Sequence, residues 1–93
     1  MELRTLHYFT VVARELNFTR AAEKLNMSQQ PLSNQIKALE EELGARLFIR
    51  GKRHLELTEE GALLLRRAVQ MQELADKTRQ ELASLREGMT GTI

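Results

Sequence analysis

Two stretches in the first half of the chain place apolar residues three or four positions apart, as on one face of an amphipathic helix. Residues 2–16 predict a first helix, with apolar positions at Leu3, Leu6, Phe9, Val12, Ala13 and Leu16. Asn17 is suited to cap a second, short helix that runs to about Leu25. A third helix is predicted to end at Gly44, with the apolar face Leu32, Ile36, Leu39 and Leu43.

The residues between the second and third predicted helices favour a tight turn. Asn26 lies where the second helix must stop, and asparagine tolerates the left-handed conformation that ends many helices. Ser28 can cap the third helix, and Pro31 falls in its first turn, where a missing N–H has no helical partner to lose. The spacing of four residues fits a helix-turn-helix: Ala22, Asn26, Met27 and Leu32. A generic helical hairpin is the alternative.

Two short segments of alternating character, residues 47–50 and 54–57, predict a small β-hairpin that must lean on the helices. Thr58 is suited to cap a final helix that we expect to run to Glu87. The predicted fold class is therefore mainly α: a winged helix-turn-helix, with three helices and a β-hairpin wing over residues 1–57, followed by a long dimerisation helix over residues 58–87.

Composition excludes several kinds of site. There is no cysteine, so thiolate metal sites and disulfides are excluded, and His7 and His54 lack the spacing of metal ligands. We find no nucleophile with a base, no carboxylate pair and no phosphate-binding glycine loop, so we expect neither an enzyme nor a cofactor. The N-terminus lacks a signal-peptide pattern and no apolar run approaches the roughly 20 residues of a membrane span, which predicts a cytoplasmic protein.

The polar face of the third helix carries the candidate recognition residues. They lie opposite the leucine stripe, include no acid, and are Gln29, Gln30, Ser33, Asn34 and Lys37. Amide side chains can bond adenine edges, serine suits a base or a phosphate, and lysine suits guanine or phosphate. An ordinary solvent-facing helix would mix charges along its length, so this face favours DNA binding.

A basic cluster in the predicted hairpin offers a second kind of contact. The net charge of the chain is only +1, yet residues 46–55 hold several cations and no acid. The wing candidates for contacting phosphates or a narrow minor groove are Arg50, Lys52 and Arg53, and a solvated basic loop is the alternative. Thr19 and Arg20, at the start of the second helix, are further candidate phosphate contacts.

The final helix carries a seam of apolar and small residues that recur at alternating steps of four and three, as in a two-helix coiled coil. The seam consists of Leu64, Ala68, Met71, Ala75, Thr78, Leu82, Leu85 and Met89. We expect it to outrun anything the small domain could cover, and a second copy of the chain is the predicted cover. A symmetric dimer would read an inverted-repeat site in double-stranded DNA.

The residues quoted so far resemble a known family. Residues 18–61, FTRAAEKLNMSQQPLSNQIKALEEELGARLFIRGKRHLELTEEG, strongly resemble the DNA-binding domain of LysR-type transcriptional regulators, and the opening MELRTLHYF fits as well. The resemblance implies a winged helix-turn-helix, a linker helix that pairs with another subunit, and a following effector-binding domain. Residues 88–93, GMTGTI, resemble the hinge before that absent domain, so we expect a fragment of a longer, ligand-responsive regulator.

The resemblance also assigns individual residues. Gln29, Gln30, Pro31 and Ser33 match the start of the family's recognition helix, and Arg50 with Arg53 matches its wing. Asn34 departs from the pattern, since many members have arginine there, and an amide that reads adenine is the replacement. Gln30, where proline is frequent, adds a donor and an acceptor.

The resemblance further implies that a small-molecule inducer acts only through the absent domain, and the homodimer formed by the long helix leaves room for a higher oligomer in the intact protein. Another winged-helix family is the nearest rival interpretation. A helical dimerisation or adaptor module without a DNA role is the rival from a different class, and the acid-free basic hairpin argues against it.

Overall fold

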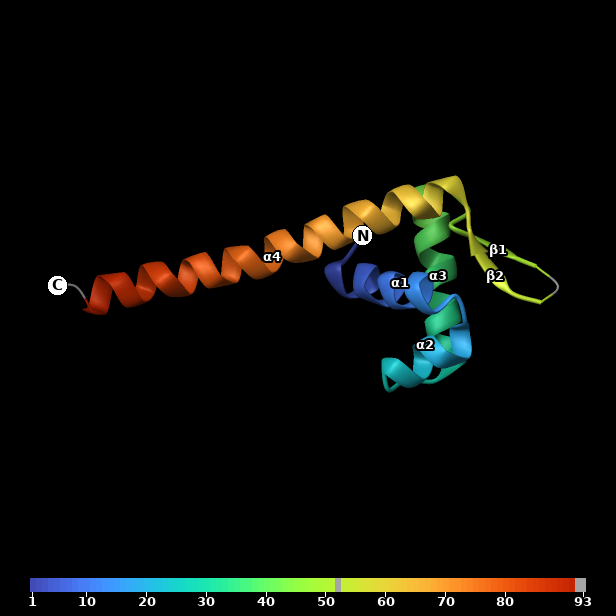
Figure 1. Ribbon diagram of the computed structural model, residues 1–93, viewed down its shortest axis with the longest axis horizontal. Coiled ribbons are helices and arrows are strands. Elements are labelled where there is room, and N and C mark those ends of the chain that lie inside the picture. The colour runs from blue at the N-terminus through green and yellow to red at the C-terminus, as the bar shows by residue number, and fades with distance from the viewer. Residues whose placement is uncertain (52, 92–93) are drawn as a thin grey trace.

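The computed structural model describes residues 1–51 and 53–91, with side chains described through residue 88. Three helices form a small unit from which a β-hairpin projects on one side and a long helix on the other (Figure 1). The order is α1 (Leu3–Glu15), α2 (Phe18–Lys24), α3 (Gln29–Leu43), β1 (Phe48–Arg50), β2 (Leu55–Leu57) and α4 (Glu59–Gly91). The predicted winged helix-turn-helix is confirmed. Lys52 and the side chain of Met89, both predicted site residues, lie outside the described residues.

The ends of α2 and α3 follow the predicted signals, except for the cap of α3. Asn17 caps α2, because its Oδ1 accepts a hydrogen bond from the Arg20 backbone N–H at 2.9 Å. Asn26 ends the turn after α2 in the left-handed region, with φ of 54°, and Gly44 ends α3 with φ of 65°. Ser28 occupies the N-cap position of α3, but its side chain makes no capping hydrogen bond.

One apolar core joins all the elements. Its largest fully buried side chains come from α1, α3 and the segment leading into β1, and they include Leu6, Phe9, Leu32, Ile36, Leu39 and Leu47. Leu43, predicted on the buried face of α3, is instead 39% exposed. It lies in the last turn of α3, where it borders a shallow apolar groove together with Leu63 and Leu64 of α4.

The seam of α4 extends beyond its own domain, as predicted, but its first three positions are covered by that domain. Ala68 is completely buried, and Leu64 and Met71 are partly buried against the same core. The physical reason is that α1 packs along this part of α4, where a small residue such as Ala68 lets two helices approach closely. Among the seam residues whose side chains the structure describes, the later positions Thr78, Leu82 and Leu85 are exposed.

The far end of α4 also differs from the prediction. The helix continues through Gly91 and does not end at Glu87. Residues 88–91 include no proline, and each of their two glycines costs only about 1 kcal/mol relative to alanine in a helix. The hinge role of residues 88–93 stays a prediction.

The start of α4 is packed tightly against the segment before the wing. Thr58 donates its backbone N–H to the Leu47 carbonyl at 3.0 Å, and its Oγ1 accepts from the Gly61 N–H at 2.9 Å. A Cβ added to Gly61 would collide with that Leu47 carbonyl oxygen and lie 2.9 Å from Leu57 Cδ2. Glycine at position 61 therefore allows α4 to begin directly beside the wing.

Replacing Gly61 with alanine should lower the free energy of unfolding by about 1–3 kcal/mol, the usual range for forcing an extra group into a packed site. Urea unfolding at a fixed protein concentration measures the change. Gly88→Ala is the matched control, because a Cβ there meets nothing within 4 Å. That variant should be neutral or more stable, and equal unfolding midpoints for the two variants would contradict the close contact at Gly61.

Candidate nucleic-acid interface

The first half of α3 presents a polar surface. Gln29, Gln30, Pro31, Asn34 and Lys37 are exposed and Ser33 is half-buried, whereas Leu32, Ile36 and Leu39 on the opposite side are buried. The two faces follow from the helical period, because residues three and four apart share a side. The structure thus brings the six predicted recognition residues onto one surface. Their individual contacts with DNA stay predictions.

Two of these residues are bonded to each other. Gln30 donates from Nε2 to Asn34 Oδ1 at 3.1 Å, one helical turn away. A bidentate contact from an asparagine to adenine needs the amide oxygen as well as the amide nitrogen. The bond to Gln30 therefore competes with the predicted adenine contact of Asn34 and leaves its Nδ2 group as the better-placed donor.

The wing is a two-stranded antiparallel hairpin in which Phe48 pairs with Leu57, Ile49 with Glu56 and Arg50 with Leu55. Side chains alternate between the two faces of a strand, so Phe48 and Arg50 point the same way. Phe48 is buried at 3% exposure, while Ile49 on the other face is 52% exposed. Arg50 therefore lies on the face of the wing that turns toward the helices.

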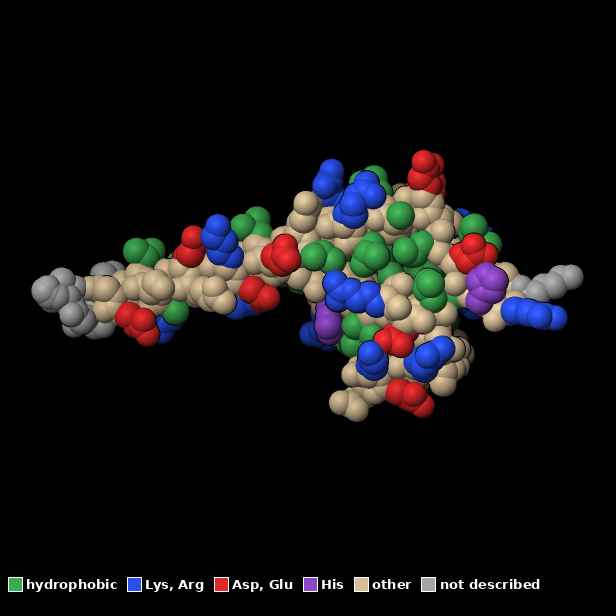
Figure 2. Space-filling model, in the orientation of Figure 1, with side chains coloured by type: hydrophobic (Ala, Val, Ile, Leu, Met, Phe, Trp, Pro, Cys, Tyr) green, Lys and Arg blue, Asp and Glu red, His purple; other side chains and the backbone are tan. Residues whose placement is uncertain are grey.

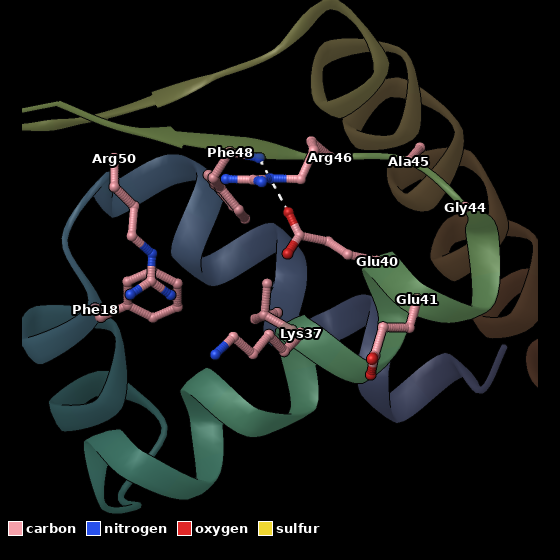
Figure 3. A pocket seen from close by; sticks show the side chains of 10 residues that line it. Phe18, Lys37, Glu40, Glu41, Gly44, Ala45, Arg46, Phe48 and Arg50 are labelled. Carbon is pink, nitrogen blue, oxygen red and sulfur yellow. Dashed lines mark hydrogen bonds between the residues drawn. The ribbon is translucent and has the colours of Figure 1, made fainter.

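The Arg50 side chain contacts both helices of the helix-turn-helix, α2 and α3. Its guanidinium carbon lies 4.9 Å from the centre of the Phe18 ring in α2, within the range of a cation–π contact (Figure 3). Its Nη2 also donates to Ser33 Oγ of α3 at 3.2 Å. The polar surface of α3 and the wing are thus joined directly by one arginine.

A carboxylate ties the wing to α3 from the other end. Glu40 Oε2 accepts hydrogen bonds from the backbone N–H groups of Leu47, at 2.8 Å, and Phe48, at 3.4 Å. The side chain is half-buried and points at the strand, as Figure 3 shows. Glu40, the first acidic residue after the polar surface of α3, therefore holds the backbone of the wing by hydrogen bonds.

An open groove of about 500 Å³ runs between α3 and the wing. Its charged lining consists of three cations and two acids: Lys37, Arg46, Arg50, Glu40 and Glu41. Three cations against two carboxylates give the lining of the groove a small excess of positive charge. A cation-lined groove beside a polar helix can accept a polyanion backbone.

The remaining residues predicted to contact DNA lie at the start of α2 and at the tip of the wing. Thr19 and Arg20 are exposed at the start of α2, and Arg53 is exposed at the tip of the hairpin. Basic and histidine side chains project at this end of the molecule (Figure 2). Arg46 was absent from the predicted site, although its position in the acid-free run 46–55 was the signal that could have included it.

The described residues contain no group of histidine, cysteine, aspartate and glutamate side chains that could hold a metal ion. Within the same part of the chain, none of the helices has the length and hydropathy needed to cross a membrane.

Residues 3–62 match the family model described as bacterial regulatory helix-turn-helix protein, lysR family. The chain belongs to the lysR family. The HTH-type transcriptional regulator BudR of Klebsiella aerogenes is 47% identical over 93 residues, which are 100% of this chain and 65% of that protein. The probable cat1 operon transcriptional activator of Acinetobacter lwoffii is 54% identical over 71 residues, 76% of this chain and 23% of that protein.

Solved structures of lysR-family domains share the fold. The BenM DNA-binding domain in complex with benA site 1 DNA has a TM-score of 0.90 at 42% identity, covering 95% of this chain and 99% of that one. The CbnR DNA-binding domain in complex with DNA has a TM-score of 0.88 at 39% identity, covering 91% and 98%. The chain thus spans a whole domain of these structures but less than two thirds of the two curated relatives.

Glu40→Ala should leave two backbone N–H groups of the wing without their acceptor, at a cost of about 1–3 kcal/mol. Amide hydrogen exchange at Leu47 and Phe48, measured by NMR, should accelerate about tenfold or more, since tenfold corresponds to 1.4 kcal/mol. Glu41→Ala is the control, because that exposed neighbour lines the same groove and is not bonded to these amides. Unchanged exchange in Glu40→Ala would show that the carboxylate does not hold the wing.

Proposed function

We propose that this chain binds double-stranded DNA in a sequence-specific manner and thereby regulates transcription. The N-terminal half of α3 enters the major groove, the wing lies beside it, and Thr19 and Arg20 contact phosphates. The observation that carries the proposal is the continuity of the surface: an acid-free polar helix face is bonded directly to the wing by Arg50 at 3.2 Å.

This arrangement fits the geometry of duplex recognition. A helix fills the major groove, where amide, hydroxyl and ammonium groups can read base edges. Cations on the adjoining wing are suited to phosphates, which give affinity without sequence information. The relatives support the proposal, since BudR is named a transcriptional regulator and the BenM and CbnR domains are solved as DNA complexes.

The rival interpretation, a helical adaptor without a DNA role, gives no reason for this surface. An adaptor would bury apolar residues against its partner, whereas the exposed surface of the first half of α3, residues 29–37, carries mainly amide, hydroxyl and basic side chains. We propose a binding protein, not an enzyme, that works in the cytoplasm. Any response to a small molecule would belong to the effector-binding domain that the resemblance implies.

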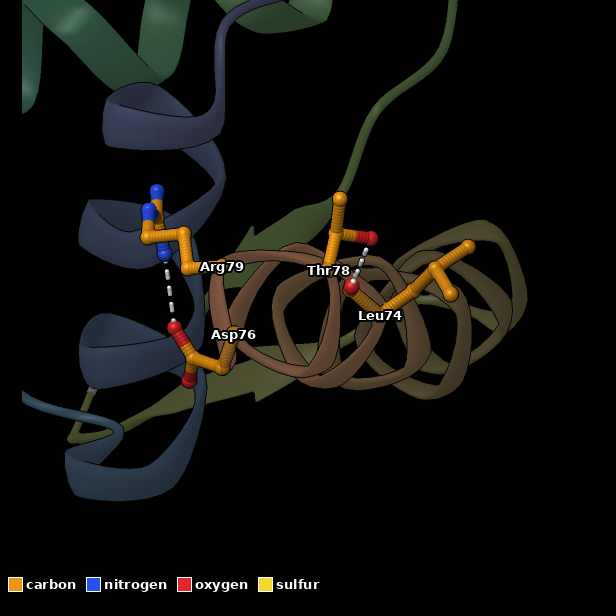
Figure 4. Close-up of polar contacts among 4 residues, drawn as sticks. All are labelled: Leu74, Asp76, Thr78 and Arg79. Carbon is orange, nitrogen blue, oxygen red and sulfur yellow. Dashed lines mark hydrogen bonds and ion pairs between the residues drawn. The ribbon is translucent and has the colours of Figure 1, made fainter. Parts of the chain in front are cut away.

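We further propose that α4 pairs with its counterpart in a second copy, through a surface that differs from the predicted seam. Leu74, Leu82 and Leu85 are 64%, 58% and 65% exposed, and Leu74 was missing from the prediction. Leu74 and Thr78 lie on the side of α4 that faces away from α1 (Figure 4). Hydrophobic side chains on a helix that projects from its domain are suited to bury one another in a dimer.

DNA binding should depend steeply on salt. Each phosphate neutralised on duplex DNA contributes about 0.9 to the slope of log affinity against log salt concentration, and two copies of the basic surface should give a slope of about 4 or more. Fluorescence anisotropy with a labelled duplex at several salt concentrations measures it. Arg53→Gln should lower the slope by about 1 per chain, and a wild-type slope below about 2 would contradict the proposal.

Leu85→Asp should abolish the dimer, because a charge on that surface would be buried without a partner. Sedimentation velocity at tens of micromolar should give a monomer for this variant and a dimer for the wild type. Ala83→Asp is the matched control: it adds the same charge two residues away, about 200° around the helix. A wild-type monomer, or a dimer that survives Leu85→Asp but not Ala83→Asp, would contradict the assigned surface.

A further inference from the structure

Arg50 faces the recognition helix, although its place in a basic wing suggested a phosphate contact. The alternation of β1 directs its side chain to the same side as the buried Phe48, and the Phe18 ring lies under its guanidinium at 4.9 Å. Phe18 is itself 9% exposed and packs edge-on against Phe48, with 6.0 Å between ring centres. The guanidinium is thus stacked on a fixed aromatic support.

The hydrogen bond from Arg50 determines the role of the Ser33 hydroxyl. Arginine has only donors, so in the 3.2 Å contact the Ser33 oxygen must be the acceptor. The hydroxyls of Thr10 and Thr78 donate to carbonyls of their own helices, His7 and Leu74 respectively. Among the residues that the structure describes, Ser33 makes no such bond. Its hydroxyl hydrogen therefore remains available to an acceptor outside the protein.

From this geometry we propose that Arg50 is a specificity-determining residue that acts through Ser33. By occupying one of the two lone pairs of the Ser33 oxygen, it favours the hydroxyl as a donor toward the major groove. The base edge that this O–H group reads carries an acceptor: N7 of a purine, O6 of guanine or O4 of thymine. Cytosine, whose major-groove edge carries only the N4 donor, is disfavoured at this position, because it could bond only to the remaining lone pair. The inference rests on the proposed binding of duplex DNA by α3.

The experiment is a binding-site selection from random duplex DNA with three proteins: wild type, Ser33→Ala and Arg50→Lys. The base pair whose preference disappears in Ser33→Ala is the one that Ser33 reads. Arg50→Lys keeps the positive charge but lacks the planar fork that both stacks and bonds. It should reduce the discrimination against cytosine at that same base pair by about three- to tenfold, the effect of one lost hydrogen bond.

The double variant Ser33→Ala/Arg50→Lys should discriminate at this base pair no less and no more than Ser33→Ala alone, since residues that act as a unit are not additive. Arg53→Lys is the matched control, the same substitution at the exposed tip of the wing. It should change the affinity for all duplexes alike and leave every base preference intact. Phe18→Leu, which removes the ring but keeps an apolar side chain, should weaken the same preference in part.

The outcomes separate the inference from the function on which it rests. If the wild type selects no site, the proposed DNA recognition fails and the inference fails with it. If the wild type selects a site while Arg50→Lys binds all duplexes uniformly more weakly, Arg50 is a phosphate contact and only the inference is overturned. A wild-type preference for cytosine at the Ser33 position would overturn it as well.

Discussion

The burial of Phe48 is the constraint on which the rest of the structure depends. This residue begins β1 and is 3% exposed, and its ring lies 5.5 Å from that of Phe9 in α1 and 6.0 Å from that of Phe18 in α2. A hairpin of two three-residue strands is not stable alone, so it depends on this side chain, which enters the helical core. Glu40 completes the attachment by accepting hydrogen bonds from the wing backbone. The position of the wing is therefore fixed relative to the helices.

The function that we propose follows from this anchoring. With Phe48 turned inward, the alternation of the strand turns Arg50 inward as well, and the arginine meets Phe18 and Ser33. The same packing brings the cations of the groove beside the polar face of α3. A wing that moved independently could still supply positive charge, but it could not hold a recognition side chain in a defined hydrogen-bonding state.

Much of the fold could be predicted from local sequence signals, because each helix carries its own period, cap or stop. Asn17, Asn26 and Gly44 adopt the predicted conformations for reasons that lie within a few residues of each. The sequence could not show in the same way which part of α4 is covered by its own domain and which part is exposed. Ala68 resembles the other seam residues until α1 is known to cover it. The partners of Arg50 were equally hidden: strand alternation could have shown which way it points, but not that a ring and a hydroxyl from two other helices lie there.

The central claim is that the first half of α3 and the wing form one DNA-binding surface, separate from the exposed half of α4. An NMR titration of the ¹⁵N-labelled protein with a duplex obtained by selection tests it most directly. The account predicts that backbone amide signals shift at the start of α2, in residues 29–37 and in the described part of the hairpin, while signals of α4 beyond Leu74 stay in place. Shifts concentrated in that half of α4, with α3 and the wing unchanged, would contradict it.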